Sequence, residues 1–474
     1  MERILTTEHM RAADNYTSET LGGGEEILVE RAGQALADEI SSRFKGGRIL
    51  FCVGKGNNGA DGRVAAKILS TKHGFNVSVL SVYNGIFKLL EKSYDIIVDC
   101  IFGTGLNKPV EGKYKEVIEK INQSGAFIVS CDIPSGLNGD TGKVLGVAVK
   151  ANLTISIQEY KLGQFLNDGL DYCGRIVCKD IGISVWGEDF IKRINDNDAK
   201  IYFSKRNRNT HKGSYKKACV LGGSKDYSGS IILSANALTA LKMGVGYSCL
   251  AVPNSIWHAY VGKVPECVLT PFDDDIQGDL SDLYKFNKYD CIALGMGMGV
   301  TQRVYEIVSY LLTNYQGTLV LDADALNAIA VYGVDILLNK RCKVILTPHV
   351  AEFSRISKHE IKDVLNNPIL KAKEFAKKYE VNLLLKNAVS VITDGYDVYL
   401  NTTGSSGLAK CGSGDVLSGI IAGLCARTSE TLESLVVSAY IFGKAGEFVE
   451  SEQNAYTMTA SDVINVLPMV INKL

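Results

Sequence analysis

Short apolar runs rich in β-branched residues alternate with stretches of helical periodicity along most of the chain. In the first half, apolar residues at helical spacing predict helices over 7–20 and 25–43. Strands are predicted at 48–53, 76–82, 94–102, 126–133 and 153–157. This alternation is typical of an α/β protein with a largely parallel sheet.

A polar, charged stretch over 189–210 separates this series from a second one. The second half is predicted to contain strands at 217–221, 248–252, 289–294, 318–323, 342–347 and 382–386, a hairpin at 390–400, and helices at 228–244, 302–314, 366–379 and from 415 onward. A chain of 474 residues is too long for one ordinary hydrophobic core. We therefore expect two α/β domains, residues 1–200 and residues 206–474.

Composition and charge exclude several classes of protein. The net charge of −1 argues against nucleic-acid binding, because such domains usually carry a basic stripe. Six of the twelve cysteines lie within or at the end of apolar runs and no CxxC pair occurs, which indicates a reducing compartment. No signal-peptide core is evident, and no run reaches the roughly 20 apolar residues of a membrane span. We therefore expect a cytoplasmic protein that binds no membrane.

A glycine-rich loop follows the first predicted strand of the first half. Gly54, Gly56 and Gly59 have the GxGxxG spacing that lets backbone N–H groups approach a phosphate. A redox Rossmann domain also needs an acidic residue after its second strand, and that strand here ends Ser-Val-Tyr-Asn-Gly without one. The glycines alone therefore do not indicate a dehydrogenase.

Polar side chains follow three strands of this half, within residues 57–61, 99–106 and 132–136. The carboxyl ends of parallel strands meet in one crevice, where ligands bind. Asp and Asn at such positions can also serve only as helix caps. Three polar loops at the same sheet edge favour a binding site.

These loops carry the motifs GNNGADG, DCIFGTGL and DIPSG, and in this order they resemble the NAD(P)H-hydrate epimerase domain over about residues 1–185. The resemblance implies a Rossmann-like α/β/α sandwich. It also implies the substrate-binding residues Asn57, Asn58, Gly59, Ala60, Asp61, Gly103, Thr104, Gly105, Leu106, Asn107, Lys108, Pro109 and Tyr114. Asp132 is implied to bind substrate and is our choice for the proton-transfer residue, because epimerisation at C6 needs a positioned acid or base. Asn58, Asp99 and Ser135 are implied to bind K⁺.

The second half ends with a glycine- and serine-rich loop that leads into an apolar helix. Consecutive N–H groups at Gly412, Ser413 and Gly414 predict an anion site at the helix N-terminus. Asp415 beside them can act as a base on a substrate hydroxyl, as a small-molecule kinase requires. The plainer alternative is a helix with an aspartate in its first turn, stabilised by the helix dipole.

The motifs HKGSYKKACVLGGS, LGMGMG, LDADALN, TPHVAEF and GSGDVLSG make residues 210–474 resemble the ADP-dependent NAD(P)H-hydrate dehydratase, which has a ribokinase-like fold. The resemblance implies that Ser230, Gly299 and His349 contact the hydrated nucleotide and that Asp415 is catalytic and binds substrate. The implied adenine-nucleotide residues are Lys386, Asn387, Ala388, Val389, Ser390 and Gly414. The implied reaction is phosphorylation of the C6 hydroxyl of the S epimer followed by elimination. ADP is the expected donor, ATP the alternative, and Mg²⁺ the expected metal.

The chain departs from the family pattern at several of these positions: Ala60, Ala351, Asn387 and Cys411 replace glycines, Ser230 replaces alanine, and Lys410 replaces threonine.

Two activities in one chain make chemical sense, because a dehydratase that acts on one epimer would leave the other epimer to accumulate. Hydrated NADH and NADPH (NADHX and NADPHX) and ADP are the expected partners, and apolar helices favour a homo-oligomer. The alternative is a ribokinase-like kinase for another small alcohol, fused to a non-catalytic nucleotide-binding module.

Overall fold

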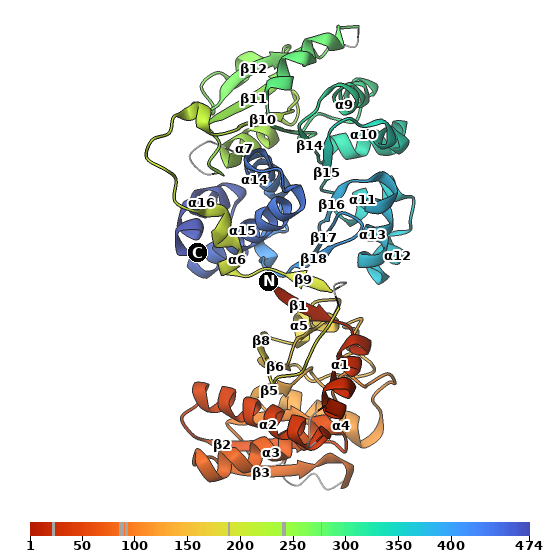
Figure 1. Cartoon of the computed structure of the whole chain (residues 1–474), viewed down its shortest axis with the longest axis vertical. Coiled ribbons are helices and arrows are strands. Elements are labelled where there is room, and N and C mark those ends of the chain that lie inside the picture. The colour runs from red at the N-terminus through yellow and green to blue at the C-terminus, as the bar shows by residue number, and fades with distance from the viewer. Residues whose placement is uncertain (21–23, 85–89, 91–92, 188–189, 239–242, 276) are drawn as a thin grey trace. The chain divides into compact units, whose positions relative to one another are not determined.

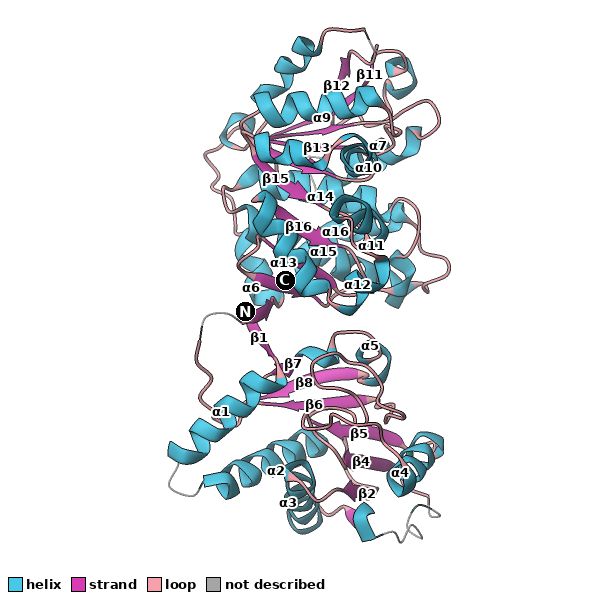
Figure 2. Cartoon of the chain, turned by 90° about the vertical axis from the view of Figure 1, so that its right-hand side faces the viewer, coloured by secondary structure: helices cyan, strands magenta, loops and turns pink. Residues whose placement is uncertain are grey.

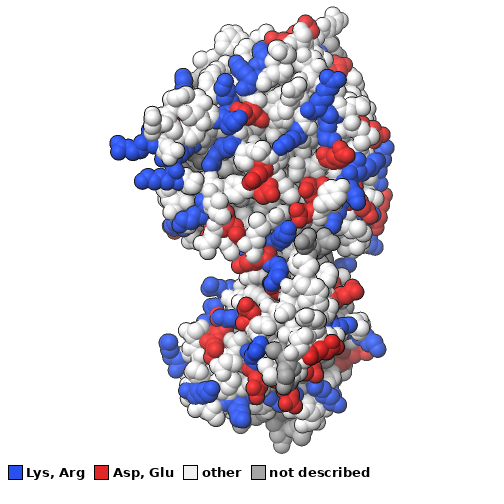
Figure 3. Space-filling view, in the orientation of Figure 1, with Lys and Arg blue, Asp and Glu red and all other residues white. Residues whose placement is uncertain are grey.

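The computed structural model describes residues 1–474 except 21–23, 85–89, 91–92, 188–189, 239–242 and 276. The chain forms two compact units: Glu2–Phe190, the N-terminal unit, and Ile191–Leu474 with Met1, the C-terminal unit (Figure 1). On the face drawn in Figure 3, Lys and Arg side chains are interspersed with Asp and Glu side chains. Within the described residues, no helix combines the length and the apolar character that a membrane crossing requires.

The N-terminal unit is built on a six-stranded sheet of order β3-β2-β4-β5-β6-β8, in which all neighbouring strands are parallel. The strands are β2 (Arg48–Val53), β3 (Asn76–Ser81), β4 (Ile96–Cys100), β5 (Phe127–Cys131), β6 (Leu153–Ile157) and β8 (Arg175–Lys179). A further parallel pair is formed by β1 (Glu2–Leu5) and β7 (Tyr160–Lys161). The central strands β4 and β6 are buried along their whole length, as their continuous apolar sequences predict.

Helices cover both faces of this sheet (Figure 2). One face packs against α1 (Thr7–Thr20), α2 (Gly24–Arg43) and α3 (Asn57–Lys72), and the other against α4 (Gly112–Gln123). The short helix α5 (Gly169–Tyr172) precedes β8. The two apolar layers confirm the predicted Rossmann-like α/β/α sandwich.

The start of α3 differs from the sequence-based expectation. The polar residues from Asn57 to Asp61 are not a loop before the helix but its first turns. The chain turns tightly here because Gly54 has no side chain: a Cβ at Gly54 would lie 2.0 Å from the carbonyl oxygen of Ile101. Ala60 lies within this helix and is not among the positive-φ residues, so its replacement of a glycine imposes no left-handed strain.

The C-terminal unit contains a sheet of order β12-β11-β10-β13-β14-β15-β16-β17-β18-β9. It is parallel except around β17, which pairs antiparallel with both neighbours. The strands are β9 (Ile191–Arg193), β10 (Lys217–Leu221), β11 (Tyr247–Pro253), β12 (Val268–Phe272), β13 (Cys291–Leu294), β14 (Thr318–Leu321), β15 (Lys343–Leu346), β16 (Asn382–Leu385), β17 (Ser390–Thr393) and β18 (Val398–Asn401). The predicted hairpin at 390–400 is confirmed as β17 and β18.

Two layers of helices cover this second sheet (Figure 1). One layer packs into the large core cluster and contains α7 (Ser228–Leu238), α14 (Ser413–Arg427), α15 (Thr431–Glu452) and α16 (Ala460–Lys473). The other layer contains α9 (Gln302–Asn314), α10 (Asp324–Tyr332), α11 (Val350–Ser357), α12 (Ile361–Asn366) and α13 (Pro368–Tyr379). Helix α14 is buried along almost its entire length, so the loop before it is held firmly against the sheet.

The periodicity missed several short elements. Strands β1, β7, β8, β9 and β12 and helices α10 and α11 were not predicted. The described part of the predicted linker over 189–210 begins with β9 and α6 (Asp196–Lys200), residue 189 lying outside the described residues. Of the predicted helix at 228–244, residues 239–242 also lie outside them. Short or two-residue strands leave no periodicity in a sequence, because their pairing depends on partners far along the chain.

Candidate active sites

A cavity of about 740 Å³ opens in the N-terminal unit beside the carboxyl ends of the strands. Most of the predicted substrate-binding residues line it, namely Asn57, Asn58, Asp61, Gly103, Thr104, Gly105, Leu106, Asn107, Lys108, Tyr114 and Asp132. Gly59, Ala60 and Pro109 are not among the lining residues. Gly59 instead packs against the backbone of Gly54, where a Cβ would lie 2.2 Å from the Gly54 carbonyl oxygen. Gly59 therefore shapes the turn rather than the cavity wall.

Asp132 is held in a strained and well-anchored position at the end of β5. Its φ of 64° lies in the left-handed region, which costs a non-glycine residue roughly 1–2 kcal/mol. Its carbonyl oxygen accepts a hydrogen bond of 2.7 Å from Gln164, and its backbone N–H donates to Ile155 at 2.8 Å. Such strain persists only where the surroundings fix it, and it is frequent at functional sites.

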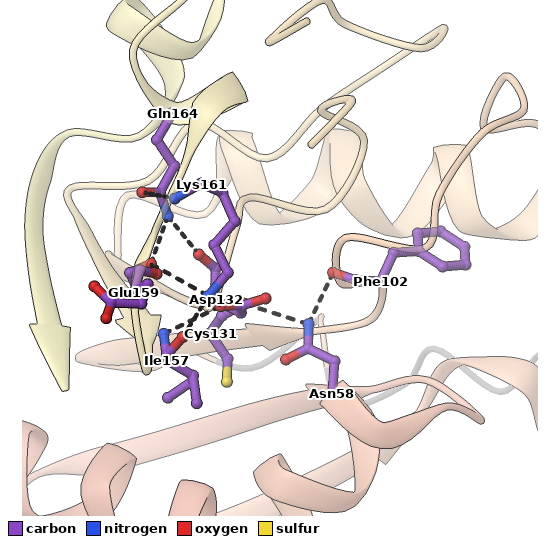
Figure 4. Close-up of polar contacts among 9 residues, drawn as sticks. Asn58, Phe102, Cys131, Asp132, Ile157, Glu159, Lys161 and Gln164 are labelled. Carbon is purple, nitrogen blue, oxygen red and sulfur yellow. Dashed lines mark hydrogen bonds and ion pairs between the residues drawn. The ribbon is translucent and has the colours of Figure 1, made fainter. Parts of the chain in front are cut away.

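The carboxylate of Asp132 forms an ion pair with Lys161, whose side chain is only 1% exposed (Figure 4). The same Asp132 oxygen, Oδ1, accepts the backbone N–H of Ile157 at 3.1 Å. Among the described residues, Oδ2 has no hydrogen-bond partner, and Asp132 lines the cavity. Lys161 was missed by the sequence analysis, because nothing in its local sequence shows that β7 brings it to the end of β5.

Of the three residues predicted to bind K⁺, Asn58 lines this cavity, and it is linked to Ser135 through the Phe102 carbonyl oxygen and so to Asp99, which bonds to Ser135. Asp99 is completely buried and accepts hydrogen bonds from the Ser135 hydroxyl at 2.6 Å, from the Ser135 N–H at 2.8 Å and from Ser130 at 2.9 Å. Burial raises the pKa of Asp99, and these hydrogen bonds oppose the rise. Asn58 donates to the carbonyl oxygen of Phe102 at 2.8 Å, while its own Oδ1 is buried with no partner in the part of the chain that the structure describes.

In the C-terminal unit, Asp415 lies in the first turn of α14. The helix begins after Gly412, whose φ of 91° suits glycine. The first N–H groups of a helix have no partner within it, so those around Gly414 remain available to an anion. Burial, together with the nearby Asp322, raises the pKa of Asp415 to about 6, whereas a hydrogen bond with Ser230 opposes the rise. Asp415 is therefore a base of moderate strength that is ionised at neutral pH.

A buried ion pair lies next to this helix. Lys386 Nζ contacts Asp322 Oδ1 at 2.8 Å, and Asp322 Oδ2 accepts from the Ser418 hydroxyl at 2.6 Å. A Cβ placed on Gly414 would lie 3.5 Å from Lys386 Nζ, so the ammonium group reaches the N-terminus of α14. Burial lowers the pKa of Lys386, but Asp322, Glu352 and Asp415 raise it by more, and the lysine stays charged. The motif LDADALN contained Asp322, but only the structure shows its partner.

His349 begins helix α11. Its Nδ1 accepts hydrogen bonds from the N–H groups of Ala351 at 3.1 Å and Glu352 at 3.3 Å, and Glu352 accepts in return from the His349 N–H. The backbone N–H of Lys386 bonds to the Pro348 carbonyl, which brings His349 beside Lys386. Burial, with Lys386 nearby, lowers the pKa of His349, so the ring is neutral at pH 7 and its Nε2 carries the proton.

The remaining predicted residues of this unit lie on neighbouring loops. The N–H of Gly299 donates to Asp324 at 2.7 Å. Asn387, Ala388 and Val389 lie in the turn between β16 and β17, with Asn387 and Ala388 exposed and Val389 buried, and the partly buried Ser390 begins β17. Lys410 is tied to the carbonyl oxygens of Tyr456 and Met458, and Cys411 is exposed. The ammonium group of Lys410 is thus engaged in holding its own loop.

The two α/β units, one with a cavity lined by both acidic and basic side chains and one with a base at a helix N-terminus, are typical of enzymes that act on nucleotides. Residues 25–92 and 85–163 match the family profile described as YjeF-related protein N-terminus, and residues 218–469 match that of NAD(P)H-hydrate dehydratase. The chain belongs to the family of bifunctional NAD(P)H-hydrate repair enzymes.

Relatives named bifunctional NAD(P)H-hydrate repair enzyme Nnr match the chain end to end. That of Thermofilum pendens is 32% identical and covers 100% of this chain and 97% of its own. That of Dictyoglomus turgidum is 30% identical, and the match covers 100% of this chain and 99% of the relative. A match that includes both units supports the repair enzyme over a small-alcohol kinase joined to a non-catalytic module.

Solved structures support the fold of the C-terminal unit. An ADP/ATP-dependent NAD(P)H-hydrate dehydratase from Bacillus subtilis, crystallised with ATP and Mg²⁺, has a TM-score of 0.52 and 27% identity, and covers 60% of this chain and 98% of its own. A ribokinase-like superfamily protein from Enterococcus faecalis has a TM-score of 0.51 at 20% identity. The predicted ribokinase-like α/β domain is confirmed.

Proposed function

We propose that the chain repairs hydrated NADH and NADPH in two steps. The N-terminal domain, within residues 1–200, interconverts the R and S epimers. The C-terminal domain, within residues 206–474, converts the S epimer back to NAD(P)H with ADP as phosphate donor and ATP as the alternative. The observation that carries the proposal is the constellation at α14, where Asp415 lies beside the Lys386–Asp322 pair at a helix N-terminus.

The C-terminal chemistry begins with proton transfer. Asp415 takes the proton of the C6 hydroxyl, and the hydroxyl oxygen attacks the terminal phosphoryl group of the nucleotide. The N–H groups at Gly414 and the ammonium group of Lys386 stabilise the negative charge that develops on the transferred group. The nucleotide leaves one phosphate shorter, as AMP when the donor is ADP. Loss of the new phosphate group from C6 together with a proton from C5 then forms the C5=C6 double bond and restores the reduced nicotinamide. His349, neutral and with a proton on Nε2, is placed to donate a hydrogen bond to the hydrated nucleotide.

The phosphates of the nucleotide would bring Mg²⁺ with them. Among the described residues, no group of three or more His, Cys, Asp or Glu side chains is arranged to hold a metal ion. Proteins usually bind Mg²⁺ through substrate phosphates and one or two carboxylates rather than in a protein cage. When bound, the ion supplies charge neutralisation on the phosphates. In the turn between β16 and β17, the exposed Asn387 replaces a glycine and is expected to alter nucleotide affinity rather than the reaction.

The N-terminal chemistry centres on Asp132, which lines the cavity and is held in place by its ion pair with Lys161. We propose that Asp132 transfers the proton that accompanies loss and return of the C6 hydroxyl.

The free cysteines, all twelve in number, support a reducing location, which we propose to be the cytoplasm. We also retain self-association as a proposal based on the apolar helices.

The proposed function is tested with a mixture of R- and S-NADHX, ADP, Mg²⁺ and K⁺, with recovery of absorbance at 340 nm as the measurement. We expect complete recovery, because the epimerase feeds the R form to the dehydratase. If only about half of the absorbance is recovered, the protein has the dehydratase activity but not the epimerase activity. No recovery with either ADP or ATP would refute the proposal.

We propose that K⁺ binds beside Asn58, Asp99 and Ser135. Asn58 Oδ1 is buried without a partner among the described residues, and the fully buried Asp99 is connected to the same loop through Ser135. A monovalent cation there would supply the missing partner and offset the carboxylate charge. Replacing K⁺ by tetramethylammonium, which is too large for such a site, is expected to slow epimerisation by about tenfold or more. Dehydration of pure S-NADHX is the control and is expected to change little. An epimerisation rate that is the same in both salts would contradict the site.

A further inference from the structure

Of the four acidic residues that line the N-terminal cavity, Asp14 and Asp61 form no side-chain hydrogen bond or ion pair among the described residues, and Asp61 is the one beside the phosphate-type loop before α3. It lies in the first turns of α3 and lines the cavity together with Asp132. Among the described residues, its carboxyl group forms no hydrogen bond and no ion pair, whereas Asp132 is anchored by Lys161 and Ile157. The two carboxyl groups therefore share a cavity but have opposite surroundings.

The charged groups that line the cavity with Asp61 come from several of the elements that border it. They are Arg11 and Asp14 on α1, Glu25 on α2, Lys55 before α3, Lys108 after β4, Asp132 after β5 and Lys161 on β7. Glu25 is engaged with Asn57, and Lys161 with Asp132. Burial, followed by the nearby Asp132 and Asp14, raises the pKa of Asp61 to about 8.

Pairs of carboxyl groups whose surroundings separate their protonation states recur as acid and base in enzymes. Here Asp132 has an ammonium partner in Lys161, whereas Asp61 has no partner among the described residues and burial favours its neutral acid form. We propose that Asp61 is a second catalytic residue of the epimerase, the general acid that protonates the departing C6 hydroxyl, with Asp132 as the base. This inference rests on the proposed epimerase function.

The step balances without any further reactant. The Asp61 proton passes to the hydroxyl oxygen, the C6–O bond breaks with its electron pair leaving as water, and the N1 lone pair forms an N1=C6 double bond. Water then adds to the opposite face of C6, Asp132 takes its proton, and the π electrons return to N1. The product is the other epimer, with one proton moved from Asp61 to Asp132. Exchange with water in the cavity restores the starting state.

The test is the Asp61→Asn enzyme, which keeps the size of the side chain but cannot donate a carboxyl proton. We expect epimerisation to fall by about 10²–10⁴-fold, mainly in kcat, while the C-terminal domain still dehydrates S-NADHX at the wild-type rate. Asp38→Asn, on the exposed surface of α2, is the matched control for loss of one carboxylate. In the wild type, kcat/KM for epimerisation should decline as the pH rises through about 8, because the acid is lost. Asp61→Glu should retain that decline.

A stability measurement separates a catalytic acid from a structural one. The pKa of Asp61 is raised from 3.8 to about 8, so between these pH values Asp61 holds a proton in the folded state that it lacks in the unfolded state. The free energy of unfolding therefore decreases as the pH rises from 3.8 to about 8. Asp61→Asn should therefore raise Tm, and by more at pH 8 than at pH 5.

The results that would refute a catalytic role for Asp61 differ from those that would refute the proposed epimerase function. If wild-type enzyme interconverts the epimers and Asp61→Asn does so equally fast, Asp61 is not the acid. A large loss in Asp14→Asn with Asp61→Asn near wild type would assign the role to Asp14 and also refute it. A wild-type enzyme that does not interconvert the epimers would instead refute the epimerase proposal.

Discussion

Replacing Asp415 by asparagine is expected to reduce dehydration of S-NADHX by about 10³-fold or more while leaving epimerisation unchanged. Asparagine fills the same space at the start of α14, but it cannot accept the proton of the substrate hydroxyl. The decrease in rate should come from loss of the base and not from unfolding. Helix α14 is buried, and the Ser234 hydroxyl can still donate its hydrogen bond to the carbonyl oxygen of residue 415 in the variant. The measurement is absorbance at 340 nm with pure S-NADHX and ADP.

The pH dependence provides the accompanying check. Burial raises the pKa of Asp415 to about 6, and a base acts only when ionised, so the wild-type rate of dehydration should rise with pH through about 6 and then level off. The residual activity of Asp415→Asn should lack this rise. A variant that keeps both the rate and the pH profile would show that another group removes the proton.

Replacing Asp132 by asparagine is expected to have the second large effect, a loss of about 10²–10⁴-fold in epimerisation. The change removes the carboxylate that lines the cavity and leaves the ammonium group of Lys161, which is buried, without its counter-charge. With racemic NADHX, recovery of absorbance should therefore stop at about half, since only the S epimer is consumed. Pure S-NADHX should still be converted at the wild-type rate.

Stability must be measured alongside this activity. Removing one partner of a buried ion pair costs about 3–5 kcal/mol, so the variant should also have a lower Tm. The matched control is Asp140→Asn in the same unit, a part-buried aspartate that accepts hydrogen bonds from Thr7. Its effect should be confined to stability. Epimerisation by Asp132→Asn at the wild-type rate would support a non-catalytic N-terminal module.

Several features of this protein followed from the order of residues alone. The apolar periodicity predicted α1 and α9 at their observed limits, and continuous apolar runs predicted the central parallel strands, because burial on both faces requires such runs. The local motifs identified Asp132 and the GSGD start of α14, since a helix N-terminus and a strand-end aspartate each have a short sequence signal.

Other features depended on contacts between distant residues. Lys161 reaches Asp132 from 29 positions away, and Lys386 reaches Asp322 from 64 positions away. No spacing rule relates such partners, because only the pairing of strands brings them together. The same is true of Asp61: the sequence placed it in a motif, but only the packing of α3 against the cavity showed a buried acid without a partner.

The sequence by itself thus determined the α/β class, the two domains and the candidate bases, because hydrophobic periodicity and turn chemistry are local properties. The tertiary structure decided which of those bases are ionised at neutral pH. Burial and neighbouring charge set the protonation of Asp61 and Asp415, and both arise only when residues remote in the chain are packed together.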